Sequence, residues 1–134
     1  LRESSLRGFC LSPYEVVVFL CGINVAKESE AFWISEWKVM RKAMHRHRQQ
    51  TFVVCLPCPT RRVSLVSAYN VFLKSKLVSV QTPTVHIIDP SDVPCLHPTH
   101  HGGIPTDFLE FDRFHLSHCG LRKIIQLWVA AVSL

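Results

Sequence analysis

Two short polar segments interrupt the apolar sequence and carry residue types that hydrolytic chemistry needs. Gly22-Ile23-Asn24 directly follows an apolar run, and Asp112-Arg113-Phe114-His115 directly precedes the last amphipathic stretch. An Asp three residues before a His can orient the imidazole and leave its other ring nitrogen free as a general base. An Asn amide after a glycine turn can donate a hydrogen bond to a developing oxyanion. Both patterns also have a structural interpretation, because Gly-x-Asn ends strands and Asp-x-x-His caps helices.

A second group of residues has the chemistry of metal ligands. Cys95 and three histidines fall within residues 95–101, and Cys55-Leu56-Pro57-Cys58 is a C-x-x-C. Zinc takes four such ligands, usually as two separated pairs, and this spacing fits no standard zinc module. A redox role is disfavoured because the C-x-x-C follows a strand-like run rather than opening a helix. Structural zinc therefore stays an alternative, and we assign no metal ligand and no cofactor.

The elements that must position these segments alternate between strand and helix. Short β-branched or apolar runs at 15–21, 51–56 and 85–88 are typical of buried strands, and amphipathic stretches follow at 28–48, 62–77 and 121–132. This alternation predicts an α/β fold, a three-layer α/β/α sandwich around a parallel sheet of at least three strands. Right-handed crossovers would then place the loops after Cys21, Leu56 and Ile88 along one edge, where ligands bind in such sheets.

The apolar stripes on the predicted helices indicate packing rather than a cofactor site. Trp33, Trp37, Met40 and Met44 recur at helical spacing, which is far more typical of a core. The second helix is expected to bury one face, and the last helix is expected to pack on the sheet and to be partly covered elsewhere. The second-helix face comprises Leu65, Val66, Tyr69, Phe72, Leu73 and Leu77. His86 is expected to be a half-exposed strand residue.

Length and composition limit the classes of protein. The chain has 134 residues, of which 48% are hydrophobic and 19% charged, so we expect one folded domain over residues 1–134. The longest apolar run, 16–23, is far shorter than the roughly 20 residues that cross a bilayer, so no membrane partner is expected. Six cysteines in a chain that needs no disulfide staples favour a reducing, cytoplasmic type of compartment.

The net charge of +5 is concentrated in part at residues 41–48. A solvated helix end explains these cations, because positive charge is favourable near a helix C-terminus. A polyanion partner is the alternative. Nucleic acid has little support, since the aromatic residues that would stack on bases are expected in the core.

The chain resembles the SGNH hydrolases, also called GDSL-type esterases and lipases, from Pro13 to about Val132. Residues 13–24 are similar to the family's third block, an apolar strand followed by Gly-x-Asn, and residues 112–120 are similar to its last block, Asp-x-x-His-Leu. The resemblance implies a flavodoxin-like fold and hydrolysis of carboxylic (acyl or acetyl) esters by a Ser-His-Asp mechanism. It makes Asn24 an oxyanion donor, Gly22 part of the substrate-binding turn, and Asp112 and His115 two members of the triad.

The sequence departs from the family at the nucleophile. The family's Ser lies in a Gly-Asp-Ser turn after the first strand, whereas only 21 residues precede Gly22 and none forms that turn. Ser4 and Ser5 are poor substitutes, and Val25 replaces the usual Asp. We therefore expect a domain without its first strand or strands, inactive as given because no acyl-enzyme can form. An exposed strand edge would favour self-association. The alternative is a non-catalytic interaction or nucleic-acid-associated module of a retroelement type.

Overall fold

The computed structural model describes residues 16–60, 63–80, 84–93, 96, 108–110 and 115–132, and the structural statements below concern these residues. In chain order the elements are β1 (Val16–Leu20), α2 (Ile23–Ala26), α3 (Glu30–Arg46), β2 (Thr51–Cys55), α4 (Val63–Val78), β3 (Val85–Ile88), the 3-10 turn η1 (Pro90–Asp92) and α5 (His118–Val132). The predicted alternation of strand and helix is confirmed.

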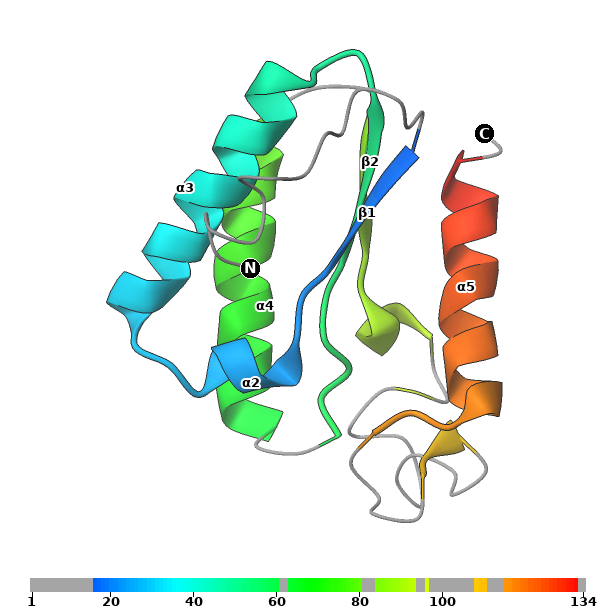
Figure 1. Cartoon of the computed structure of the whole chain (residues 1–134). Helices are drawn as coiled ribbons and strands as arrows, with labels where there is room; N and C mark the ends of the chain where they lie inside the picture. The colour runs from blue at the N-terminus through cyan, green and yellow to red at the C-terminus, as the bar shows by residue number, and fades with distance from the viewer. Residues whose placement is uncertain are drawn as a thin grey trace.

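The three strands form one parallel sheet in the order β1-β2-β3. Val18 lies opposite Val53, and Val53 lies opposite His86, which is half-buried as expected. Figure 1 shows the strands ending at the same side of the sheet, beside α2, η1 and the first turn of α5. Because parallel strands need crossover connections, α3 and α4 return the chain to the opposite side each time.

Helices cover both faces of the sheet, which gives three layers (Figure 1). Alternate residues of β2 supply the two cores, because successive strand side chains point to opposite faces. Phe52 and Val54 pack with α3 and α4, whereas Val53 and Cys55 pack with α5. On the first face, Phe52 stacks on Phe19 with ring centroids 5.7 Å apart. The α/β class is confirmed.

The stripe on α3 is core, as predicted. Trp37, Met40 and Met44 are buried, and the partly buried Trp33 packs against the same cluster. The helix begins at Glu30 rather than at 28 because the Ser29 side chain accepts a hydrogen bond from the backbone N–H of Phe32, 3.3 Å away.

Two expectations about helix faces are wrong in part. Leu65 of α4 is 42% exposed, whereas the buried stripe of this helix begins one residue later at Val66 and continues through Tyr69, Leu73 and Leu77. On α5 only Gly120 and Ile124 are fully buried, so the side of this helix that we expected to be partly covered is open. α5 also begins at His118, three residues before the predicted start.

None of the helices that the structure describes combines the length and the apolar character needed to cross a membrane.

Candidate functional site

A cavity of about 360 Å³ lies where β1 and β2 end and α5 passes the sheet. Apolar side chains and cysteines form its walls, which are Leu20, Cys21, Cys55, Leu56, Pro57, Cys58, Pro90, Leu116, Leu121, Ile124, Ile125 and Trp128. This is the edge at which the sequence predicts a ligand site, because ligands of open α/β sheets bind outside the carboxyl ends of the strands. The volume is that of a small ligand pocket.

The turn after β1 carries Gly22 and Asn24 to this edge. The backbone N–H of Cys21 donates to the carbonyl of Cys55 at 3.0 Å, which continues the strand pairing up to the turn. Gly22 precedes the first turn of α2 in an extended conformation, and the exposed Asn24 lies on that helix. The indole Nε1 of Trp33 donates to the carbonyl of Val25 at 2.9 Å. The core of α3 therefore fixes the turn on which Asn24 sits.

The segment after β2 is held by a buried polar contact from α4. Asn70 is 5% exposed, and its Nδ2 donates to the carbonyl of Pro57 at 3.1 Å. A proline on each side of Cys58 limits the backbone further. The thiol of Cys58 lies 3.7 Å from the carbonyl of Leu96, which ties this wall of the cavity to the long connection after β3.

The exit from β3 is fixed by Asp89. Its side chain accepts a hydrogen bond from the backbone N–H of Ser91 at 2.9 Å and forms an ion pair with Lys74 of α4. The hydrogen bond to Asp89 raises the pKa of Lys74. Asp89 itself is 6% exposed, so Lys74 supplies the counter-charge that a buried carboxylate needs. This pair holds η1 and Pro90 against the cavity.

His115 lies on the segment that leads into α5. Its carbonyl accepts the backbone N–H of Glu110 at 2.8 Å, and the next residue, Leu116, forms an antiparallel bridge with Leu109. The side chain of His115 is exposed. Asp112 lies outside the described residues, so the predicted Asp112–His115 pair stays a prediction.

Gly22, Asn24 and His115 are not among the residues that line this cavity, but a chain neighbour of each block is. Cys21, which lines it, is the residue before Gly22, and Leu116, which also lines it, is the residue after His115. The tertiary structure thus brings the Gly-x-Asn turn and the His115 segment to one edge of the sheet although they are more than ninety residues apart in the chain.

Two thiols at the cavity, those of Cys21 and Cys55, stay protonated near neutral pH. Burial raises the pKa of Cys21 to about 12, and burial also raises the pKa of Cys55. A thiol must lose its proton to attack, so both groups stay unreactive under ordinary conditions. They act instead as small apolar wall residues.

The sequence missed the contribution of α5 to the cavity. Ile124, Ile125 and Trp128 form one wall, but their spacing alone indicates only a packed helix face. One further signal could have revealed this wall. The three residues closely follow the His115 segment in the chain, so they are expected near any site to which His115 belongs.

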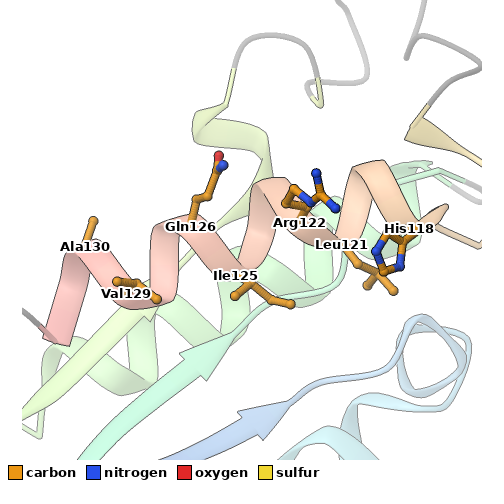
Figure 2. Close-up of a pocket in the computed structure, with 7 residues that line it drawn as sticks. All are labelled: His118, Leu121, Arg122, Ile125, Gln126, Val129 and Ala130. Carbon is orange, nitrogen blue, oxygen red and sulfur yellow. The ribbon is translucent and has the colours of Figure 1, made fainter.

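A second hollow runs along the outer side of α5 and has a volume of about 660 Å³. Figure 2 shows Leu121, Ile125 and Val129 projecting from the same side of this helix. These three side chains are 48%, 47% and 57% exposed. Leu121 and Ile125 also line the cavity at the sheet edge, so one apolar surface continues from that cavity along α5.

Nothing in the described ranges forms a group of three or more His, Cys, Asp or Glu side chains able to hold a metal ion. Cys55 and Cys58 form no disulfide there. Cys95 and residues 97–101 lie outside those ranges, so zinc at that loop stays a prediction. Comparison with known proteins adds no assignment: no family model matches the chain, and no curated protein matches it.

Proposed function

We propose that this chain is an SGNH hydrolase-like domain whose cavity at the sheet edge binds the acyl part of a carboxylic ester. The observation that supports the proposal is that Cys21 and Leu116, the chain neighbours of Gly22 and His115, line one cavity with apolar walls. An acyl chain suits such walls, because transfer of its methylene groups from water contributes about 0.8 kcal/mol each.

The chemistry assigned to the site is acyl transfer. A serine oxygen would attack the ester carbonyl while His115 takes the serine proton, and the leaving alcohol would recover that proton as the acyl-enzyme forms. Asp112 would orient His115, and Asn24 would donate to the oxyanion. The sequence contains no Gly-Asp-Ser, and the buried thiols do not replace it. We therefore propose that the chain by itself binds acyl groups and does not hydrolyse esters.

Calorimetric titration with octanoate tests the acyl site. We expect saturable one-to-one binding that weakens at least about tenfold in Ile125→Trp, because the larger side chain fills the cavity mouth. Val71→Trp is the matched control, since Val71 is an exposed apolar residue of α4 that does not line the cavity. Absence of octanoate binding, or equal loss in both variants, would overturn the proposed acyl site.

The catalytic half of the proposal is tested by hydrolysis of p-nitrophenyl acetate. We expect equal background rates for the chain and for His115→Ala, because no nucleophile is in place. Hydrolysis that His115→Ala abolishes would show that a nucleophile is present and that the inactive assignment is wrong. Zinc measured on the same sample tests the loop at 95–101 independently.

A second candidate function is self-association, and the open side of α5 favours it. β1 pairs only with β2 among the described residues, and its Val16 and Leu20 are 42% and 69% exposed. Unpaired strand edges and exposed apolar helix faces both favour contact with another chain.

Sedimentation velocity checks this candidate. We expect the average mass to rise above 15.3 kDa with concentration, and Val129→Glu to suppress the rise by placing a charge on the apolar face. Val78→Glu, at an apolar position of α4 that is more exposed (69% against 57% for Val129), is expected to leave association unchanged. A monomer at every concentration would exclude self-association.

A further inference from the structure

Another cavity, of about 270 Å³, lies at the end of the sheet where the strands begin. It lies where α3 and α4 end and β2 and β3 begin, far along the strands from the candidate acyl site (Figure 1). Its walls are Arg41, Met44, His45, Arg48, Phe52, Ser79, Val80, Thr84 and Val85. The proposed ester chemistry uses none of these residues.

Nitrogen donors gather on one side of this cavity. Arg41 and His45 are four residues apart on α3, and Arg48 follows two residues after the end of this helix; all three line the cavity. All three are exposed, and the described residues that line the cavity include no carboxylate. Two guanidinium groups without a lining counter-charge make a site of positive potential.

The helix dipole alone does not account for this arrangement. Positive charge is favourable anywhere in the last turn of a helix, and Arg46 satisfies that preference without lining the cavity. Arg41, in contrast, lies more than a turn before the end of α3 and still lines the cavity. The helix dipole therefore explains Arg46, but it does not explain why Arg41 lines the cavity.

The floor of the cavity is apolar. Met44 and Phe52 belong to the buried core and are 4% and 1% exposed, and the partly buried Val80 and Val85 complete the floor. A ligand that fits both surfaces has an anionic group at the donors and an apolar body over these side chains. The volume is slightly below the range for drug-sized ligands, so the ligand is small.

We propose that this cavity binds a small phosphate monoester with an apolar body. A guanidinium fork matches two phosphate oxygens, and two such forks with an imidazole N–H offer more donors than the two oxygens of a carboxylate accept. The three terminal oxygens of a phosphate monoester use Arg41, Arg48 and His45 together.

Calorimetric titration of the full chain with phenyl phosphate tests the proposal. We expect one-to-one binding that weakens by about tenfold or more when Arg41 and Arg48 are both changed to Gln, because each loses a charge-assisted hydrogen bond. Arg46→Gln is the control, since it removes one positive charge from the same helix end without changing a residue that lines the cavity. We expect it to change the affinity by less than about twofold, because Arg46 is exposed and does not line the cavity, so it makes no direct contact with the ligand.

Further ligands separate the anionic from the apolar contribution. Phenyl phosphate is expected to bind more tightly than both inorganic phosphate and benzoate, and benzyl alcohol is expected not to bind. Vesicles of phosphatidylcholine with phosphatidic acid distinguish a lipid phosphate from a soluble one. If the Arg41/Arg48 variant loses vesicle binding as much as it loses phenyl phosphate binding, the same site binds a lipid headgroup.

Three outcomes would overturn the proposal. The first is no saturable binding of phenyl phosphate at millimolar concentration. The second is an equal loss in Arg46→Gln, which would indicate unspecific attraction of anions. The third is tighter binding of a single-stranded oligonucleotide that weakens equally in the Arg41/Arg48 variant and in Arg46→Gln, which would identify an extended polyanion surface instead of a cavity.

Discussion

Gly120→Ala is expected to destabilise the protein by about 2 kcal/mol, although alanine normally stabilises a helix relative to glycine by about 1 kcal/mol. Gly120 lies in the first turn of α5, and a Cβ there would overlap the carbonyl oxygen of Phe108 and crowd Leu116, 3.2 Å away. The Phe108 carbonyl has little freedom to move, because it accepts the backbone N–H of Ser117 at 2.9 Å. The close approach therefore requires a residue without a side chain.

Denaturant unfolding of Gly120→Ala and Gly22→Ala measures this effect. Gly22 is the matched control, since a Cβ there meets no atom within 4 Å and its φ of −82° suits any residue. We expect Gly22→Ala to raise the free energy of unfolding by less than about 1 kcal/mol, because alanine restricts the unfolded chain more than glycine does. A stabilised Gly120→Ala would mean that the packing between Phe108 and α5 is looser than described.

The same contact has a consequence for the candidate site. Leu116 and Phe108 hold the segment that contains His115, so displacement of the first turn of α5 moves this wall of the cavity. We expect Gly120→Ala to weaken octanoate binding as well. Gly22→Ala in the same assay tests a separate point, which is whether the turn before Asn24 tolerates a side chain.

Stability is expected to fall steeply above pH 9, which is the second large effect. Burial raises the pKa of Cys21 to about 12 from an ordinary 9.0, and burial likewise raises the pKa of Tyr69, which shares a side-chain hydrogen bond with Cys21. Burial raises the pKa of Cys55 too. These groups stay protonated in the folded chain while the unfolded chain releases their protons from about pH 9.

The loss of stability at high pH follows from the number of protons that the folded and unfolded chains bind. Above pH 9 the unfolded chain binds fewer protons, so the free energy of unfolding decreases as pH rises. One such thiol lowers the free energy of unfolding by about 1.4 kcal/mol for each pH unit between its pKa in the unfolded chain and its pKa in the folded chain. Lys74 acts in the same direction, because its pKa is raised by Asp89 and the stability that the ion pair contributes is lost as pH passes from 10.5 through the folded value.

Urea unfolding in reducing buffer at pH 7, 9, 10 and 11 checks this prediction. Cys21→Ala is expected to lower stability by a constant amount and to reduce the slope with pH, because it removes one of the shifted groups. Cys119→Ala is the control, since that thiol is exposed. An identical pH slope in Cys21→Ala and in the original chain would show that Cys21 is not the group that titrates.

The order of strands and helices, the parallel sheet and the core of α3 were predictable from the sequence. Buried parallel strands are continuous β-branched runs such as 51–56, and an amphipathic helix reveals its packed side by the spacing of residues such as Trp37, Met40 and Met44. The common edge for the Gly-x-Asn turn and His115 was predictable as well, because right-handed crossovers between parallel strands leave one arrangement.

Other features depended on distances between segments that the sequence does not encode locally. Periodicity cannot tell whether an apolar face of α5 is covered, so the exposure of Ile125 and Val129 and the cavity beside them appear only when all layers are in place. The pKa of Cys21 and the need for glycine at position 120 have the same origin. Burial and close approach belong to pairs of segments, and only the tertiary structure decides which segments meet.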